Sequence, residues 1–343
     1  MEQSDFLCIT VMTTGACNFR CSYCFESHEH PSLSSESISN ICSIVSEYKR
    51  DHNELKRLIV IWFGGEPTLS IEYIVELSQS LKKIAQKESI DYSSRIITNG
   101  YHLDRIIPLI EDLNLTDIQV TLDGMPDTHD SRRMHASGKK TFNKIIENLL
   151  QIETRIDLVI RVNVDSENIN QIRELFLMVK QLPFSPEVRV FFQPMLVEDY
   201  GGESSCYLGR ITNDRALYLE YLELQKDIGI LEKPVFLGAF CNVDFPGALV
   251  VTSDGKIVKC WADINDREKN DIKVYDSNVS QRIRKFYGSV FDLRYERCEA
   301  CVIFPACLGG CKYIDYTEEQ CEIKRELMIL QAQKYLEDTI SKG

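Results

Sequence analysis

The sequence lacks both a long hydrophobic run and an excess of positive charge. No apolar stretch in its 343 residues approaches the roughly 18 residues that a transmembrane helix requires. Its 39 basic residues face 52 acidic ones, and the net charge of −13 argues against general binding to a nucleic-acid backbone. The first residues, MEQSD, lack the basic and apolar parts of a secretion signal. We therefore expect a cytoplasmic protein that binds neither membranes nor nucleic acids.

The composition is that of a folded protein. Hydrophobic residues make up 44% of the chain and charged residues 27%, which excludes disorder as the main state. The length predicts one large domain and a smaller one. Internal repeats and low-complexity tracts are absent from the sequence.

Apolar, strand-like runs alternate with helical patterns up to about residue 194. The strand-like runs occupy 6–14, 58–63, 95–98, 117–123, 157–164 and 188–193. The helical patterns occupy 34–50, 70–87, a stretch from about 102, 141–151 and 168–180. Six strands that alternate with helices in this way predict an α/β protein with a parallel sheet, either open or closed into a partial (β/α)6 TIM-like barrel.

The pattern changes after residue 194. We expect a loop at 197–209, a helix at 213–228, a boundary at 231–234, a hairpin within 248–261 and a final helix from about 318. The hairpin would turn at Asp254 and Gly255. We therefore divide the chain into a barrel domain (1–205), a helical bridge (206–235) and a cysteine-rich domain that ends in a helix (236–343).

Thirteen cysteines are present, and ten of them lie in spaced groups. In a reducing compartment such groups indicate metal ligands rather than disulfides. Cys8, Cys42 and Cys206 stand apart, and we expect Cys8 and Cys42 to be small buried apolar residues.

The first group is C-x3-C-x2-C and follows the first predicted strand. We refer to Cys17, Cys21 and Cys24 as the amino-terminal cysteines. Three thiolates can hold three irons of a cubane cluster and leave the fourth iron open. The alternative is structural zinc, for which His28 or His30 could supply the fourth ligand.

The surrounding residues resemble the radical S-adenosylmethionine (radical SAM) enzymes. TGACNFRCSYCFE (14–26) is similar to the family's signature. GGEP (64–67), TNG (98–100) and TLDG…HDSRR (121–133) follow the second, third and fourth predicted strands. These positions are the carboxyl ends of parallel strands, where α/β proteins place their sites.

The resemblance implies a role for each matching residue. The amino-terminal cysteines would bind the [4Fe–4S] cluster that cleaves SAM. The residues implied in SAM binding are Tyr23 near the adenine, Gly64, Gly65 and Glu66 at the methionine amino group, Thr98 and Asp123 near the ribose, and Arg133 at the carboxylate. Asn163 and Gln193 are weaker candidates, because polar residues are common at strand ends. Phe63 stands where some relatives have a glutamine.

Seven further cysteines resemble the SPASM domain of radical SAM peptide-modifying enzymes. We call them the carboxy-terminal cysteines: Cys241, Cys260, Cys298, Cys301, Cys307, Cys311 and Cys321. The resemblance implies an outer auxiliary [4Fe–4S] cluster on Cys298, Cys301, Cys307 and Cys321. It implies an inner one on Cys241, Cys260 and Cys311, and hence three clusters in the protein. Local spacing alone would group Cys298, Cys301, Cys307 and Cys311, and two zinc ribbons are the alternative without clusters.

The inner cluster lacks a fourth cysteine in this pattern, because no cysteine lies between 242 and 259. Asp244 or Cys206 could complete it, or a substrate thiolate could bind the open iron. Cys206 is also a candidate catalytic hydrogen donor.

The two resemblances imply a radical SAM/SPASM peptide maturase. It would cleave SAM to a 5′-deoxyadenosyl radical, abstract hydrogen from a ribosomally made peptide and form a thioether or carbon–carbon cross-link. An alternative is an anaerobic sulfatase-maturating enzyme, which makes formylglycine. Such enzymes typically carry an aspartate base after the second SPASM cysteine, where this chain has Trp261, with Asp263 as the nearest acid. A non-catalytic iron–sulfur or zinc protein is the third possibility.

The expected partners are a precursor peptide or protein and an external reductant of the flavodoxin or ferredoxin type. Cys17 follows only 16 residues, so we expect no fused leader-binding module. The barrel mouth, the SPASM surface or a separate protein would then recognise a substrate leader.

Overall fold

The structure is a computed structural model that describes residues 5–197, 215–230, 247–264, 295–307, 309–310 and 317–341. Four residues of the sequence analysis, Cys206, Cys241, Asp244 and Cys311, lie outside the described residues.

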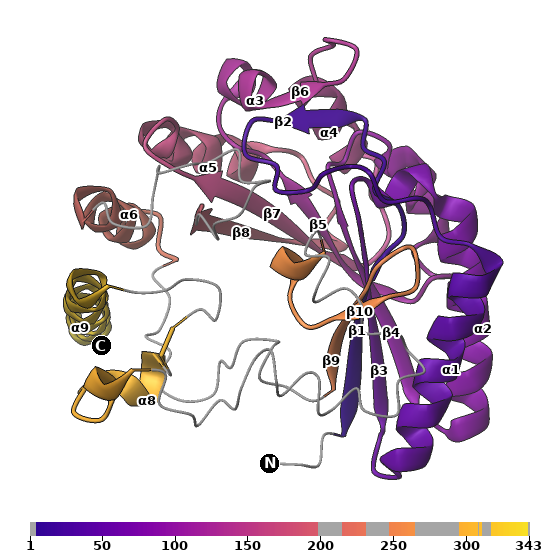
Figure 1. The fold of residues 1–343 in the computed structure, drawn as a ribbon. Helices are drawn as coiled ribbons and strands as arrows, with labels where there is room; N and C mark the ends of the chain where they lie inside the picture. The colour runs from indigo at the N-terminus through magenta and orange to yellow at the C-terminus, as the bar shows by residue number, and fades with distance from the viewer. Residues whose placement is uncertain are drawn as a thin grey trace.

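An eight-stranded sheet forms the centre of the molecule, with the order β10-β9-β1-β3-β4-β5-β7-β8 (Figure 1). Six of its strands are parallel and follow one another along the chain: β1 (Phe6–Met12), β3 (Arg57–Phe63), β4 (Asp91–Thr98), β5 (Leu115–Thr121), β7 (Ile156–Val164) and β8 (Val188–Leu196). The predicted α/β fold with a mostly parallel sheet is therefore confirmed.

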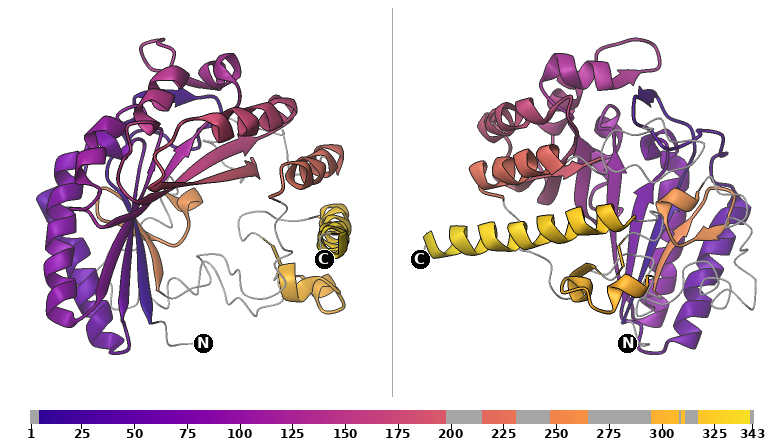
Figure 2. Two further views of the ribbon diagram at one scale, coloured as in Figure 1. Left: turned by 180° about the vertical axis from the view of Figure 1, so that it is seen from behind. Right: turned by 60° about the vertical axis from the view of Figure 1, so that its left-hand side comes forward.

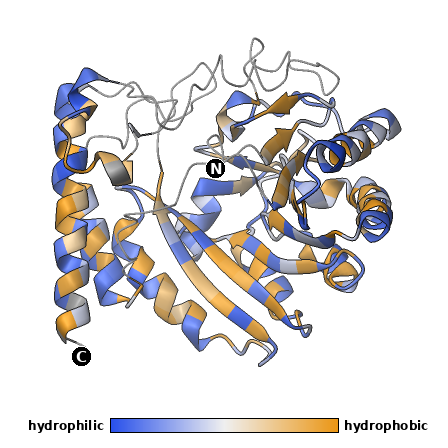
Figure 3. Ribbon diagram, turned by 90° about the horizontal axis from the view of Figure 1, so that it is seen from below, coloured by the Kyte–Doolittle hydropathy of each residue, from blue (hydrophilic) through white to orange (hydrophobic). Residues whose placement is uncertain are grey.

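Helices cover the outer face of this sheet (Figure 2). They are α1 (Ser35–Asp51), α2 (Ile71–Glu88), α4 (Phe142–Leu149) and α5 (Ile172–Gln181). The α1 sequence shows why: Ser34 caps its first turn by accepting a hydrogen bond from the Ser37 amide, and Ile38, Ile41 and Val45 are buried on one face. Apolar residues are concentrated on the strands, while the helices mix polar and apolar residues (Figure 3).

Two segments differ from the sequence prediction. The helix expected from about 102 is replaced by two short 3-10 helices, Leu103–Arg105 and Ile107–Leu109. Pro108 lies in the first turn of the second one, where it cannot donate a backbone hydrogen bond to a longer helix. The segment between the predicted strand 117–123 and the predicted helix 141–151, for which the sequence indicated no element, contains α3 (Pro126–Arg132) and β6 (Arg133–His135). Strand β6 pairs antiparallel with β2 (Phe19–Cys21) in a separate two-stranded ribbon.

The predicted hairpin consists of β9 (Ala248–Val251) and β10 (Ile257–Val258), which are antiparallel, with Gly255 at a φ of +80° in the turn. By sequence, this hairpin belongs to the predicted cysteine-rich domain (236–343). In the structure β9 also pairs in parallel with β1 and extends the main sheet. The Ser37 hydroxyl, in α1, donates to the Ser253 carbonyl and joins the hairpin turn to the first helix.

The two predicted later helices are α6 (Arg215–Asp227) and α9 (Glu318–Ser341), and a short helix α8 (Phe304–Cys307) precedes α9. Helices α6 and α9 contact each other through the ion pairs Arg215–Glu326 and Lys334–Glu223. Cys8 and Cys42, expected to be buried, are only half-buried in β1 and α1. No helix in the described ranges combines the length and apolar composition needed to cross a membrane.

Candidate active site

The amino-terminal cysteines lie in the loop that follows β1. Cys21 ends β2, and the β2–β6 ribbon pairs it directly with Arg133. The loop is closed from the other side, because the Gly15 amide donates to the His30 carbonyl at 3.2 Å. A Cβ atom at Gly15 would lie 2.6 Å from that same oxygen, so this crossing requires glycine. The three thiols thus occupy a loop that is held at both ends.

The three thiols are half-buried in this loop, and all three are neutral as free thiols at neutral pH. Burial raises the pKa of Cys17 to about 12, and the nearby Glu66 adds to the shift. Burial likewise raises the pKa of Cys24 to about 12. For Cys21 burial also raises the pKa, although Arg133 opposes it. Iron binding must therefore displace protons from these sulfurs.

The GGEP loop after β3 is packed against the cysteine loop. A Cβ at Gly64 would lie 2.4 Å from the Thr14 carbonyl oxygen, and one at Gly65 would lie 2.5 Å from the Ala16 carbonyl oxygen. The Gly65 amide donates to Thr14 at 2.8 Å. Gly64 also has a φ of +141°, which side chains rarely adopt. Both glycines are needed for this close approach of two backbones.

The Glu66 carboxylate joins the ends of two strands. Its Oε1 accepts hydrogen bonds from the Thr68 amide, the Thr68 hydroxyl and the Thr98 hydroxyl, the last at 2.6 Å. Its Oε2 accepts from the Asn99 amide at 2.7 Å. Burial raises the pKa of Glu66, and the hydrogen bonds from Asn99, Thr98 and Thr68 oppose the shift. Glu66 therefore fixes the loops after β3 and β4 relative to each other.

Four of the residues that the resemblance assigns to SAM form one polar cluster, which we call the Tyr23 cluster: Tyr23, Asp123, Arg133 and Asn163. The Tyr23 hydroxyl hydrogen-bonds Asp123 and accepts from Arg133. The Asn163 side-chain amide donates to the Tyr23 hydroxyl at 3.0 Å, and its backbone amide donates to Asp123 at 2.9 Å. Arg133 also forms an ion pair with the fully buried Asp123 at 3.8 Å. Four different segments of the chain thus meet beside Cys21.

The Tyr23 phenol and the Arg133 guanidinium both stay protonated at neutral pH. Burial raises the pKa of the Tyr23 hydroxyl well above its ordinary value, so the phenol stays protonated. Burial alone would lower the pKa of Arg133, but Cys21, Tyr23 and Asp123 raise it, and the guanidinium stays charged. Its buried Nε atom has no hydrogen-bond partner among the described residues. A buried donor without a partner is unusual in a native protein.

The neighbouring Arg132 has a different environment. Its Nη1 donates to both carboxylate oxygens of Asp165, at 3.0 and 2.9 Å, and to Glu167 at 3.2 Å. The Arg132 and Asp165 side chains are only 4% and 1% exposed. Helix α3 ends at Arg132 and β6 begins at Arg133, so the chain changes direction between them. Arg132 therefore stabilises the end of β7, and Arg133 faces the cysteine loop.

Sequence reasoning missed two residues that support the Tyr23 cluster. The Asn168 side chain donates to the Asp123 and Asn163 carbonyls at 2.8 and 2.9 Å. The buried His129 accepts a hydrogen bond from the Asp123 amide at its Nδ1. His129 is the first residue of the HDSRR motif (129–133), so the motif itself could have indicated it. Nothing in the sequence marks Asn168, because its role depends on where its helix begins.

Three other residues named in the sequence analysis, Gln193, Phe63 and Asp263, do not belong to the Tyr23 cluster. Gln193, on β8, is opposite Arg161 and makes no hydrogen bond to the Tyr23 cluster within the described part of the chain. Phe63 packs edge-to-face on Trp261, with ring centroids 4.3 Å apart. Asp263 is fully buried in the 3-10 turn that follows Cys260.

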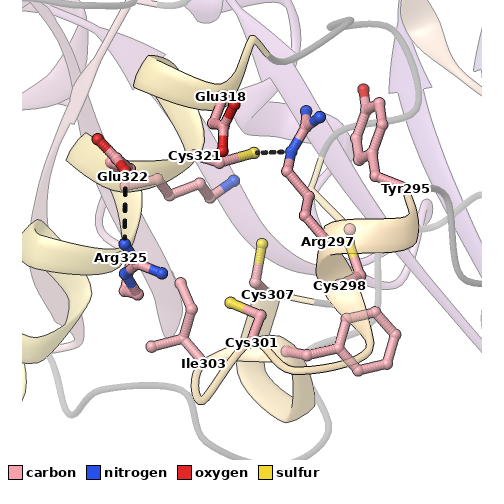
Figure 4. A pocket seen from close by; sticks show the side chains of 13 residues that line it. Tyr295, Arg297, Cys298, Cys301, Ile303, Cys307, Glu318, Cys321, Glu322 and Arg325 are labelled. Carbon is pink, nitrogen blue, oxygen red and sulfur yellow. Dashed lines mark hydrogen bonds and ion pairs between the residues drawn. The ribbon is translucent and has the colours of Figure 1, made fainter.

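Four of the carboxy-terminal cysteines line one pocket: Cys298, Cys301, Cys307 and Cys321 (Figure 4). They come from the 3-10 turn Glu296–Cys298 and the residues after it, from α8 and from the first turn of α9. These are the four residues that the SPASM resemblance assigns to the outer cluster. Cys311, which local spacing would have included, lies outside the described residues.

The zinc alternative for the amino-terminal cysteines named His28. His28 Nε2 is 3.6 Å from the Cys24 sulfur, and its Nδ1 is 3.1 Å from the Gly15 carbonyl oxygen. Yet no three His, Cys, Asp or Glu side chains in the described ranges converge as ligands of a single metal ion. A cubane cluster does not require three side chains to converge on one metal ion, because each of its cysteines binds a different iron.

Comparison with known proteins identifies the family. Residues 11–179 match the radical SAM superfamily. The chain is 26% identical over 331 residues to the cysteine-type anaerobic sulfatase-maturating enzyme of Clostridium novyi (strain NT), covering 86% of this chain and 85% of that enzyme. The structure of native anSMEcpe with bound AdoMet and Kp18Cys peptide aligns with a TM-score of 0.73 at 18% identity, over 98% of this chain and 100% of that one. Streptococcus suis SuiB bound to precursor peptide SuiA aligns with a TM-score of 0.60 at 14% identity, over 89% and 71%.

The fold and the matching segment define a SAM-dependent class of enzyme. Residues 11–179 form a radical SAM domain, and the protein is a radical SAM enzyme. The predicted family is therefore confirmed, as is the use of SAM and a [4Fe–4S] cluster that the family shares. The alternative of a non-catalytic iron–sulfur or zinc protein is wrong. The solved structures support the α/β fold of the chain.

Proposed function

We propose that this enzyme modifies a ribosomally made peptide or a protein, and that the Tyr23 cluster positions SAM for the reaction. The observation that carries the proposal is the buried guanidinium of Arg133 beside the amino-terminal cysteines, whose Nε has no hydrogen-bond partner in the described part of the chain. A planar guanidinium can bind a carboxylate through two parallel hydrogen bonds. The methionine carboxylate of SAM is such a group.

The remaining residues fit the other parts of SAM. The close approach at Gly64 and Gly65 leaves backbone groups, and no side chains, facing the loop of the amino-terminal cysteines. Glu66 Oε2 accepts one hydrogen bond within the described residues, so it retains capacity for the methionine ammonium. Thr98 donates to Glu66, which makes it a support for that contact as well as a candidate near the ribose. Tyr23 and Asp123 complete the adenosine side of the proposed site.

When bound, SAM and the reduced cluster would supply the radical chemistry that removes hydrogen from the substrate. The protein's own residues bind, orient and exclude water. The auxiliary clusters are part of the proposal. The outer one would use the four cysteines of Figure 4. The inner one would use Cys260 with Cys241 and Cys311, and Cys206, Asp244 or a substrate thiolate would complete it.

The reaction we favour is an oxidative cross-link, either a thioether or a carbon–carbon bond. The substrate would lose two hydrogens, one as an atom and the other as a proton released to water together with an electron, for which an auxiliary cluster would be the acceptor. The contact between Phe63 and Trp261 favours this choice. Trp261 stands where sulfatase-maturating relatives have an aspartate base, and an aromatic pair there cannot remove a proton. Asp263, the nearest acid, is fully buried.

Formylglycine formation is the second candidate, because the similarity to a sulfatase-maturating enzyme spans 86% of this chain. The two reactions are separated by incubating the reconstituted enzyme anaerobically with SAM, a reductant and peptides encoded beside the gene, or with sulfatase-derived peptides. We expect a neighbouring peptide to lose two hydrogens without reacting with an aldehyde-specific hydrazide. Hydrazide labelling of a sulfatase-derived peptide would establish the second candidate instead. Cleavage of SAM with no change in any peptide would contradict both.

Two partners belong to the same proposal. The amino-terminal cluster needs an external reductant of the flavodoxin or ferredoxin type, and a separate leader-binding protein could deliver the peptide. Omitting each candidate protein from the assay and measuring 5′-deoxyadenosine and modified peptide separately would assign their roles. Loss of both products identifies the reductant, and loss of the modified peptide alone identifies the leader-binding protein.

A further inference from the structure

The pocket of the carboxy-terminal cysteines contains a cation that contacts one of its sulfurs. The Nε atom of Arg297 donates a hydrogen bond to the Cys321 sulfur at 3.3 Å (Figure 4). Arg297 lies next to Cys298 in the turn Glu296–Cys298, whereas Cys321 lies in the first turn of α9. The contact therefore joins two of the segments that supply sulfurs to the pocket.

The guanidinium is held in place by an aromatic ring. Its central carbon lies 4.0 Å from the centroid of Tyr295, at the start of the same turn. Stacking of this kind suits a planar guanidinium better than a lysine ammonium. Arg297 itself is exposed, so the stacked ring is what restricts an otherwise mobile side chain. The direction of the N–H toward the sulfur follows from this arrangement.

A donor at a ligand sulfur acts on the redox state of an iron–sulfur cluster. The reduced cluster carries one more negative charge than the oxidised one, so a hydrogen bond and a positive charge stabilise the reduced form more. We propose that Arg297 raises the reduction potential of the outer auxiliary cluster through its hydrogen bond to Cys321, with Tyr295 as its support. Arg297 is thus a positioning and tuning residue, not a ligand. The inference rests on the proposed outer cluster at the four cysteines of this pocket.

The chain offers a matched control for the positive charge alone. Arg325, on α9, lines the same pocket, and its guanidinium lies 4.0 Å from Glu322. Arg325→Leu removes a cation from the pocket but leaves the bond between Arg297 and Cys321. Comparing it with Arg297→Leu separates the hydrogen bond from the general charge of the surroundings. Arg297→Lys retains the charge and loses the stacked, directed N–H.

The experiment is a redox titration followed by electron paramagnetic resonance. It uses the full chain with the amino-terminal cysteines replaced by alanine, so that the SAM-cleaving cluster does not contribute. Arg297→Leu should lower the equilibrium constant for reduction of the outer cluster roughly three- to tenfold, which is about 30 to 60 mV for one electron. Arg297→Lys should give an intermediate shift and Arg325→Leu a smaller one. Tyr295→Leu should lower the potential in the same direction as Arg297→Leu.

Two results would overturn the inference: an unchanged potential in Arg297→Leu, or equal shifts in Arg297→Leu and Arg325→Leu. If Arg297→Leu does not assemble its clusters, Arg297→Gln, which keeps a neutral N–H donor, is titrated instead and should lower the potential relative to the wild type. An unchanged potential in both Arg297→Gln and Tyr295→Leu would then overturn the inference. Failure of the underlying cluster proposal has a different signature. In that case Cys301→Ala and Cys321→Ala would leave the iron and sulfide content of the protein unchanged.

Discussion

Replacing Arg133 tests the proposed SAM site most directly. Loss of a buried, charge-assisted contact with the SAM carboxylate should cost roughly 2–4 kcal/mol. Because about 1.4 kcal/mol is a tenfold change in affinity, Arg133→Ala should bind SAM on the order of tens to hundreds of times more weakly. That variant also leaves the buried Asp123 without its ion pair. Arg133→Lys avoids this problem, since it keeps the charge and removes only the planar fork, and we expect it to bind about ten times more weakly.

Arg132→Lys is the matched control, one residue away on the same chain segment. Its guanidinium is paired with the buried Asp165 at the end of β7, so the substitution should lower the stability of the protein but change SAM affinity by less than about twofold. The assay is anaerobic calorimetric titration of SAM into reconstituted protein, with thermal unfolding measured on the same samples. The reasoning fails if both Arg133 variants bind SAM like the wild type, or if Arg132→Lys weakens binding as much as Arg133→Lys.

Three further predictions concern other parts of the site. Alanine at all three amino-terminal cysteines should abolish 5′-deoxyadenosine formation while iron bound by the carboxy-terminal cysteines remains; retained product would refute the assignment. Gly64→Ala should destabilise the protein by roughly 1–3 kcal/mol more than Gly138→Ala in chemical unfolding. Both glycines have positive φ, but a Cβ at Gly138 meets no atom within 4 Å; equal losses would contradict this. Burial, with Arg133 and Arg132 adding to it, holds the pKa of His129 well below its ordinary value of 6.5. The unfolded chain therefore binds a proton that the folded one does not, and stability should fall as pH drops below about 6.5, by up to roughly 1.4 kcal/mol per pH unit. His129→Gln should remove this share of the slope in urea unfolding between pH 5 and 7, and an unchanged slope would argue against it.

Much of the fold could be predicted because buried parallel strands are nearly continuous apolar runs. The run 58–63 predicted β3 within one residue, and the pattern at 34–50 predicted α1 equally well. The helix expected from 102 was wrong, since Pro108 interrupts its hydrogen bonding. The β2–β6 ribbon was missed because three-residue strands carry no readable alternation.

The site was predictable at the level of motifs and less so in its contacts. The structure places most of the strand-end candidates close together, because parallel strands bring their carboxyl ends to one edge of the sheet; their roles stay predictions. The sequence does not indicate which of the adjacent residues Arg132 and Arg133 pairs with Asp165 and which lies in the Tyr23 cluster, because both are arginines. That difference depends on where α3 ends. The pairing of Phe63 with Trp261 joins residues nearly 200 positions apart, and no local pattern indicates such a contact.

The pairing of β9 with β1 has a consequence for exchanging parts between enzymes of this kind. Strand β1 is hydrogen-bonded to β3 on one side and to β9 on the other, from Cys8 opposite Ala248 to Val11 opposite Val251. A chimera that received a foreign carboxy-terminal half would also receive a foreign edge strand. Unless its register and apolar side chains matched β1, the graft would leave a row of unpaired amides and carbonyls on the strand that leads into the amino-terminal cysteines. A carboxy-terminal half can therefore be exchanged between such enzymes only if the β1 strand that pairs with its β9 is exchanged with it.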